Sequence, residues 1–112
     1  MNTEVKQENN GTIIAVSGSV DALTAPELSK ILLDQIADGH ANLVVSLVGV
    51  EFMSSAGLRT LLGALKEARS NGGDLRIASV NPGVDKVLKM SGFHTIAKVF
   101  ASPDEAISSF GS

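Results

Sequence analysis

Two adjacent serines, Ser54 and Ser55, are the residues of this sequence whose position best suits chemistry. They lie in the run FMSSAGL at residues 52–58, between an apolar segment and a leucine-rich one. A serine at the start of a helix accepts a hydrogen bond from a first-turn amide, so one of the two must be the N-cap. A phosphoryl group on an exposed serine there would meet unpaired amides and add about two negative charges. The pair therefore suggests a regulatory phosphoacceptor.

The sequence gives little support to a catalytic site. Neither of the glycine-rich phosphate-binding motifs, GxxxxGK[ST] and GxGxxG, is present. Met53 stands where a nucleophile elbow around Ser55 would need glycine, and no histidine is near in sequence. The carboxylates are scattered, without a paired histidine or second carboxylate at a useful spacing. We therefore expect no enzyme and no catalytic residue.

Composition excludes several other classes of protein. The absence of cysteine excludes a disulfide scaffold and a thiolate zinc site. His40 and His94 have no carboxylate at ligand spacing, so we expect neither a metal nor a cofactor. The net charge is −3, and Trp, Tyr and basic runs are absent, so no nucleic-acid partner is expected. The N-terminus is polar and the apolar runs are short, which predicts a cytoplasmic protein without direct membrane insertion.

The elements that must position the serines follow from turn residues and hydrophobic spacing. Strands are predicted at residues 3–8 and 12–17 around an Asn-Asn-Gly turn, then a helix from a Thr24–Glu27 capping box to Gly39. A buried strand at 43–48, a connection at 49–56 and a helix from about residue 58 to Asn71 follow. The remaining expected elements are a strand at 74–79, a helix at 81–91, a strand at 96–100 and a helix at 103–110 capped by Ser102 or Asp104.

The element order β-β-α-β-α-β-α-β-α predicts an α/β fold in one domain over residues 1–112. We expect a mixed, largely parallel small sheet with helices packed on it. Right-handed crossovers between parallel strands would place the functional loops at the carboxyl ends of those strands.

Three segments resemble the STAS domain, namely residues 18–28 (GSVDALTAPEL), 44–50 and 52–58. More narrowly, nearly the whole chain resembles the stand-alone anti-sigma factor antagonists of bacteria. The resemblance implies a STAS fold and a role in transcription regulation by partner switching. In that mechanism the unmodified antagonist binds a serine kinase that is also the anti-sigma factor. The kinase uses Mg-ATP to phosphorylate the antagonist, and a metal-dependent serine phosphatase removes the phosphate.

The resemblance also implies site residues. The family pattern is acid-Ser-(Ser/Thr/Ala)-Gly-Leu with phosphorylation at the second position, which aligned on the Gly-Leu pair is Ser55. Ser54 replaces the acid. The preceding strand of the family carries an LDLSGV-like run, where this chain has Ser46 and Val48. The resemblance implies a partner-binding surface made of Asp21, Thr24, Ser54, Gly57, Leu58 and Arg59 around the phosphoacceptor.

Two alternatives of other classes remain open at this stage. One is a STAS subunit that never receives phosphate, acting as a scaffold in a signalling assembly or as the partner of a transporter ATPase. The other is a small-molecule or nucleotide-binding module, because loops of parallel sheets suit ligands. The missing glycine-rich loop argues against the second. Phosphate incorporation from a kinase would distinguish the STAS subunit that never receives phosphate from a phosphorylated switch.

Overall fold

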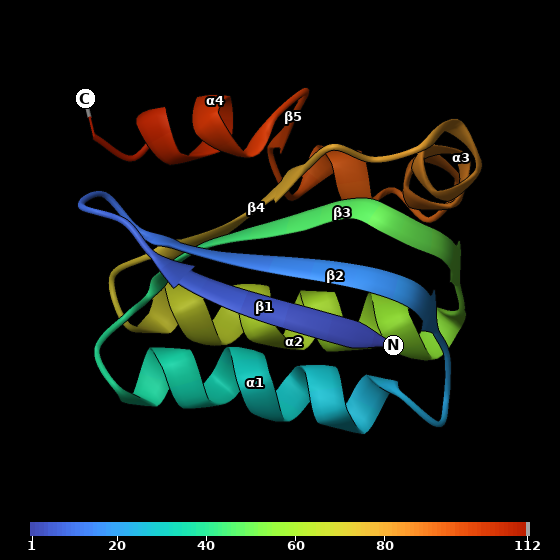
Figure 1. Cartoon of the computed structure of the whole chain (residues 1–112), viewed down its shortest axis with the longest axis horizontal. Helices are drawn as coiled ribbons and strands as arrows, with labels where there is room; N and C mark the ends of the chain where they lie inside the picture. Colours follow the sequence, from blue (N-terminus) through green and yellow to red (C-terminus); the bar gives the residue numbers. More distant parts are fainter. Residues whose placement is uncertain (112) are drawn as a thin grey trace.

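The fold is one mixed sheet with helices on both sides, as described by a computed structural model for residues 1–111 (Figure 1). The strands lie side by side in chain order: β1 (Asn2–Gln7), β2 (Thr12–Val20), β3 (Asn42–Met53), β4 (Asp74–Ala78) and β5 (Val99–Phe100). β1 is antiparallel to β2, and all other neighbours are parallel. The predicted fold class is confirmed.

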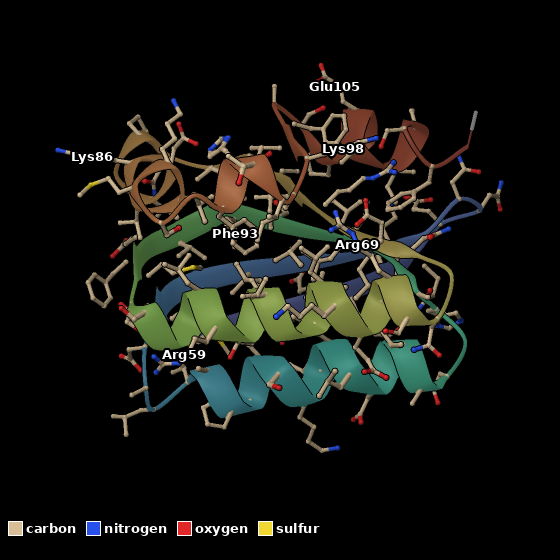
Figure 2. All side chains as sticks on the ribbon, turned by 180° about the vertical axis from the view of Figure 1, so that it is seen from behind. Arg59, Arg69, Lys86, Phe93, Lys98 and Glu105 are labelled. Carbon is tan, nitrogen blue, oxygen red and sulfur yellow. The ribbon has the colours of Figure 1, made fainter. Side chains whose placement is uncertain are left out.

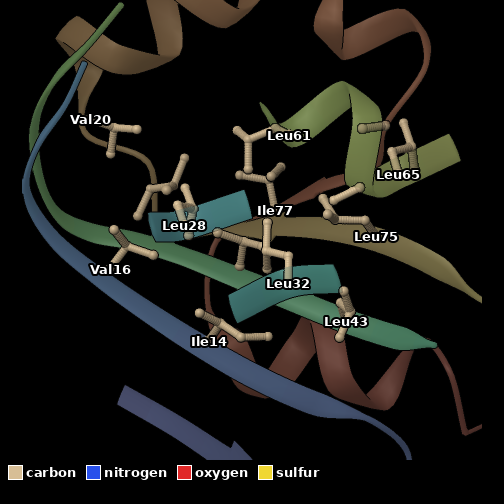
Figure 3. Close-up of a cluster of buried hydrophobic side chains, with 14 of the residues drawn as sticks. Ile14, Val16, Val20, Leu28, Leu32, Leu43, Leu61, Leu65, Leu75 and Ile77 are labelled. Atoms are coloured by element: carbon tan, nitrogen blue, oxygen red, sulfur yellow. The ribbon is translucent and has the colours of Figure 1, made fainter. Parts of the chain in front are cut away.

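The helices divide between the two sides of the sheet. α1 (Ala25–Ala37) and α2 (Ser55–Ser70) cover one side, whereas α3 (Pro82–Met90), a 3-10 turn at Phe93–Thr95 and α4 (Pro103–Ser108) lie on the other (Figure 1). The main core lies between the sheet and the first pair of helices. Its fully buried side chains include Ile14, Leu28, Leu32, Leu43, Leu61, Leu65, Leu75 and Ile77 (Figure 3).

A second, smaller apolar cluster lies under α4. Val44, Ala78 and Ala106 are its buried members, and Ile13, Phe100, Ile107 and Phe110 pack against them. Arg76 of β4 adds polar contacts to this cluster: its guanidinium lies 3.9 Å from the centroid of the Phe110 ring, and Nη1 donates to Ser109 Oγ at 2.6 Å. Hydrophobic packing and one arginine together attach α4 to the sheet.

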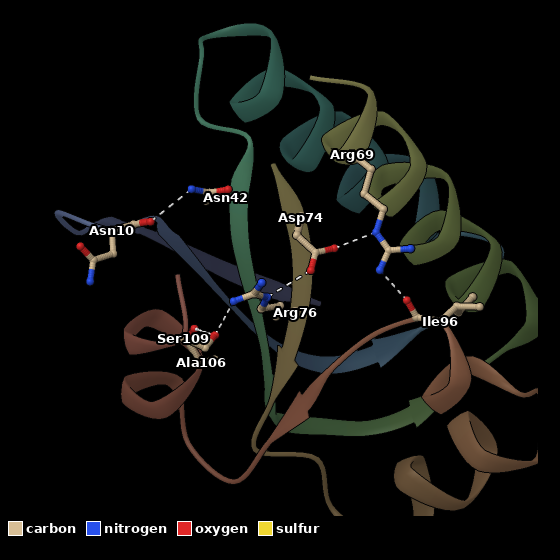
Figure 4. Close-up of polar contacts among 8 residues, drawn as sticks. All are labelled: Asn10, Asn42, Arg69, Asp74, Arg76, Ile96, Ala106 and Ser109. Carbon is tan, nitrogen blue, oxygen red and sulfur yellow. Dashed lines mark hydrogen bonds and ion pairs between the residues drawn. The ribbon is translucent and has the colours of Figure 1, made fainter. Parts of the chain in front are cut away.

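The same arginine belongs to a polar network that reaches α2 (Figure 4). Asp74 accepts from Arg76 Nε at 3.1 Å through one oxygen and from Arg69 Nε at 3.0 Å through the other. Arg69 in turn donates to the carbonyl oxygen of Ile96 at 2.6 Å. The network therefore connects the end of α2, the start of β4 and the segment before β5.

The strands that lead to the serine pair are longer than the sequence analysis predicted. Residues 49–53, expected in a connection, continue β3 to Met53, and β2 continues from Ser17 to Val20. The two extensions pair with each other, with register shifts between Ala15 and Ser17 and between Gly18 and Ser19. Such bulges depend on the partner strand, and the local residue pattern does not show them.

The predicted Thr24–Glu27 capping box does not form. Thr24 is the N-cap of α1 but has helical dihedrals, φ −97° and ψ −21°, and its side chain makes no capping hydrogen bond. Its hydroxyl accepts instead from the Asp21 amide at 2.9 Å and donates to the Ser19 carbonyl at 3.0 Å. The turn before the helix therefore uses the hydroxyl that a capping box would need.

Two further predictions were wrong at the C-terminal end. The strand expected at residues 96–100 contains only Val99 and Phe100. A 3-10 turn at Phe93–Thr95 comes just before it, so the chain becomes extended later than predicted. The last helix ends at Ser108, two residues before the predicted end. Of the two candidate caps, Ser102 is the N-cap, and its Oγ accepts from the Glu105 amide at 3.2 Å.

A carboxylate joins α3 to the 3-10 turn. Asp85 contacts His94 Nε2 at 2.7 Å and Lys89 Nζ at 3.0 Å. The hydrogen bond from Lys89, followed by that from His94, lowers the pKa of Asp85 below its ordinary value of 3.8. Because the folded pKa is depressed, these contacts stabilise the fold above the ordinary value and are lost as pH falls through the folded pKa.

We therefore expect Asp85→Asn to destabilise the protein near neutral pH by less than about 1 kcal/mol, since the pairs are partly exposed. Urea unfolding of both proteins at pH 7 and at a pH below the depressed pKa of Asp85 would test this. The difference between wild type and variant should disappear at the lower pH, where the wild-type carboxyl is protonated. A difference of equal size at both pH values would mean that Asp85 acts through packing and not through charge.

Candidate functional site

Ser54 is the residue that begins α2, and its polar atoms are all engaged. It is the N-cap, with extended dihedrals (φ −88°, ψ 174°), and its Oγ accepts from the Gly57 amide at 3.4 Å. Its amide donates to the Val20 carbonyl at 2.9 Å, and its carbonyl accepts from Leu58 at 3.1 Å. Ser54 is partly buried and links the end of β2 to the start of α2.

Ser55, the first residue of α2, is exposed. Its side chain takes part in no hydrogen bond within residues 1–111, and its own amide and that of Ala56 have no acceptor there. These are first-turn N–H groups, which a helix leaves unpaired. The hydroxyl of Ser55 is therefore exposed to solvent beside unpaired first-turn amides.

Gly57 and Leu58 seat the helix on the sheet. Gly57 is buried, and a Cβ placed on it would lie 2.9 Å from Val20 Cγ1 and 3.1 Å from Met53 Cγ. The first turn of α2 therefore lies directly against the ends of β2 and β3. Leu58 is partly buried and packs against the main core. Gly57 and Leu58 therefore support the Ser55 turn from the side of the core, through close backbone packing and a partly buried side chain, respectively.

The turn from Asp21 to Thr24 lies beside this helix start. Asp21 Oδ1 accepts from the amides of Leu23 at 2.9 Å and Thr24 at 3.1 Å. The hydrogen bond from the Thr24 amide, followed by that from Leu23, lowers the pKa of Asp21 below its ordinary value. The carboxylate is therefore ionised at neutral pH and is used within the turn.

Two exposed apolar side chains lie at the same end of the sheet, and the sequence analysis did not single them out. Leu23, at the tip of the turn, is 90% exposed, and Phe52, paired with Ser19 across β2 and β3, is 54% exposed. Large apolar side chains in such positions are typical of contact surfaces. The available sequence clues were a leucine within a polar turn and a phenylalanine two residues before the serines.

Arg59 is an exposed cation one helical turn after Ser55. Its side chain lines a groove between α1 and α2 together with Ala22, Ala25, Ala56 and Thr60, and it lies near the start of α2 (Figure 2). Residues four apart on a helix share a face, so Arg59 is within the range of a charged group carried on Ser55.

Ser46, which stands at the position of the family's aspartate, lies away from this site. It is 2% exposed in the middle of β3, between Ala15 and Ala78 of the neighbouring strands. It precedes Ser54 along an extended strand, which places it on the order of 20 Å away. The absence of an acid at position 46 therefore changes little around Ser55.

Residues 1–111 contain no group of three His, Asp or Glu side chains arranged to hold a metal ion. His94, which had no carboxylate nearby in sequence, does contact Asp85, and Lys89 shares that carboxylate. None of the helices described has both the length and the apolar character to cross a membrane.

Comparisons with known proteins show the family and the fold of this chain. The STAS domain profile matches residues 2–106. The chain is 29% identical over 111 residues to the anti-sigma F factor antagonist of Paenibacillus polymyxa, covering 96% of this chain and 94% of that one. The crystal structure of an anti-sigma factor antagonist from Mycobacterium paratuberculosis superposes with a TM-score of 0.90 at 24% identity, over 99% and 94% of the two chains. The phosphorylated form of the Bacillus cell fate determinant SpoIIAA superposes with a TM-score of 0.75 at 20% identity, over 96% and 97%. The chain belongs to the STAS domain family.

Proposed function

We propose that this chain is an anti-sigma factor antagonist that works as a protein-binding switch and catalyses no reaction itself. With Ser55 unmodified it binds a serine kinase that is also an anti-sigma factor, in the cytoplasm. Phosphorylation of Ser55 releases it, and a serine phosphatase restores it. The observation that carries the proposal is the exposed Ser55 hydroxyl beside free amides, at the end of the sheet where Leu23 and Phe52 are also exposed.

The chain supplies only the acceptor for the phosphoryl group. Ser55 Oγ forms the new bond to the γ-phosphorus of the kinase-bound Mg-ATP, the bond to the bridging oxygen breaks, and ADP leaves. The hydroxyl proton passes to a base of the kinase. The product is a phosphate at the first position of α2, where the free amides and the helix dipole favour an anion, and where Arg59 is near enough to pair with it.

Release follows from where the new charge lies. Docking a partner over the Asp21–Thr24 turn and the start of α2 would cover Leu23, Phe52 and Ser55 together. An unmodified serine is compatible with such a contact, whereas a phosphate must lose its hydration as the partner covers it. The phosphate therefore has little effect on the stability of the free protein but strongly raises the free energy of the complex with the partner.

We expect Ser55→Ala to bind the kinase as wild type does, and Ser55→Glu to bind at least about tenfold more weakly, because a charge enters the contact surface. Alanine should not disturb the helix start, since Ser54 is the N-cap. The partner is first isolated with tagged protein from a lysate of the source bacterium and identified by mass spectrometry, and affinities are then measured by calorimetry.

Ser108→Glu serves as the matched control, because Ser108 is an exposed serine on α4, on the other side of the sheet. It should bind as wild type does. Equal affinities for wild type and Ser55→Glu would contradict the proposed surface. Isolation of a transporter ATPase or a signalling scaffold in place of an ATP-binding kinase would support the non-phosphorylated STAS subunit.

A further inference from the structure

β1 is an edge strand, and its pairing with β2 fixes which of its backbone groups face outward. Within residues 1–111 its only neighbouring strand is β2, and it lies at the front edge of the sheet in Figure 1. The amide of Glu8 donates to the carbonyl of Gly11 at 2.8 Å across the hairpin. In antiparallel pairs hydrogen-bonded and non-hydrogen-bonded positions alternate, so the next bonded residues of β1 are Lys6, Glu4 and Asn2.

The intervening residues Thr3, Val5 and Gln7 therefore direct their peptide N–H and C=O groups away from β2, toward the open edge. These three positions are symmetric about Val5, whose side chain is 43% exposed. The side chain of Gln7 is held inward by Gln35 and Thr12, which leaves its backbone groups accessible. An edge with evenly spaced, unpaired peptide groups is a template for another strand.

The charges on β1 match this symmetry. Glu4 and Lys6 are equally spaced on either side of Val5 and point to the same face of the sheet. When two copies of β1 pair antiparallel about Val5, Glu4 lies opposite the partner's Lys6, and Lys6 opposite the partner's Glu4. Charged side chains on an edge usually oppose pairing between copies, but this order of acid and base makes the edge complementary to itself.

We propose that two copies of this chain associate through β1, antiparallel and centred on Val5, so that one sheet continues across both copies. Val5 exchanges two backbone hydrogen bonds with the partner's Val5, and Thr3 does so with the partner's Gln7. The charged pairs occupy the non-hydrogen-bonded positions, where side chains are closest. Among residues 1–111 of one copy, Lys6 pairs only with Glu8, at 3.2 Å, and its side chain is largely exposed, so it remains available to the partner. The proposal does not depend on the proposed function, because Ser55 is not part of this edge.

Sedimentation equilibrium of the full chain over a range of concentrations tests the proposal. Glu4→Lys and Lys6→Glu should each raise the dimer dissociation constant about tenfold, because each replaces two attractive pairs by repulsive ones. The double variant Glu4→Lys with Lys6→Glu should recover most of the affinity. The double variant is compared with Lys6→Glu alone, because both proteins have lost the ion pair between Lys6 and Glu8 and differ only at position 4.

Two further measurements test the register itself. Val5→Pro removes an outward N–H and no hydrogen bond to β2, so it should abolish the dimer while the circular dichroism spectrum stays native. Amide hydrogen exchange should protect Val5 and Gln7 only at concentrations where the dimer forms, and Glu4 and Lys6 at all concentrations. A protein that stays monomeric up to ~1 mM, a dimer unaffected by Val5→Pro, or a double variant no tighter than Lys6→Glu would each overturn the proposal.

Discussion

Incubation with the partner kinase and Mg-ATP should place phosphate on Ser55 in the wild type and in Ser54→Ala, and leave Ser55→Ala unlabelled. The Ser55 hydroxyl is exposed and takes part in no hydrogen bond within residues 1–111. The Ser54 hydroxyl is partly buried and accepts from the Gly57 amide as the helix cap. Intact-mass measurement followed by peptide mapping would show which serine is modified.

Ser54→Ala needs a stability control, because loss of an N-cap costs about 0.5–2 kcal/mol. Labelling should therefore be measured well below its unfolding temperature, with Ser70→Ala as a variant that removes an exposed serine at the other end of α2. If phosphate were retained in Ser55→Ala and lost in Ser54→Ala, the acceptor would be Ser54 and not Ser55. No phosphate in any of the three proteins would favour the non-switching scaffold.

Gly57→Ala and Gly63→Ala should change stability in opposite directions, although both place the same methyl group on α2. At Gly57 the new Cβ would be 2.9 Å from Val20 Cγ1 and 3.1 Å from Met53 Cγ. Forcing an extra methyl into such a contact costs about 1–3 kcal/mol. At Gly63 nothing lies within 4 Å, so alanine should stabilise the helix by about 0.5–1 kcal/mol.

Urea unfolding of the three proteins measures both effects, and Gly63→Ala serves as the control for the helix propensity of alanine. Gly57→Ala should also shift the backbone resonances of Ser54 and Ser55, because the start of α2 must move away from β2 and β3. If Gly57→Ala were as stable as Gly63→Ala, α2 would not be seated on the strand ends as closely as the distances indicate.

The sequence was sufficient to predict the order and type of the elements, because buried strands and amphipathic helices leave local patterns. Sequence-based prediction was wrong where the local structure depends on a contact with residues far apart in the sequence. Residues 49–53 include exposed Glu51 and Phe52, and they form strand only because the extension of β2 pairs with them across two bulges. Thr24 and Glu27 match a capping box, yet the Thr24 hydroxyl bonds within the preceding turn instead.

The candidate site shows the same division. The sequence predicted that one of the two serines begins the helix, because an N-cap depends on residues that are close along the chain. The close approach of Gly57 to Val20 and Met53 depends on how α2 crosses the sheet, and no local pattern encodes it. The Asp85–His94 contact joins a helix to a separate turn, so spacing along the chain does not show it.

α4 is attached to the sheet by few contacts, and this affects which part of the protein unfolds first. The helix has six residues and rests on a small cluster apart from the main core, with Arg76 as its principal polar contact. Proteins open in cooperative units whose free energies follow the apolar contacts they must break. We therefore expect the C-terminal segment to be a low-stability foldon that exchanges with solvent by sub-global unfolding, while the strands and helices that carry Ser55 remain folded.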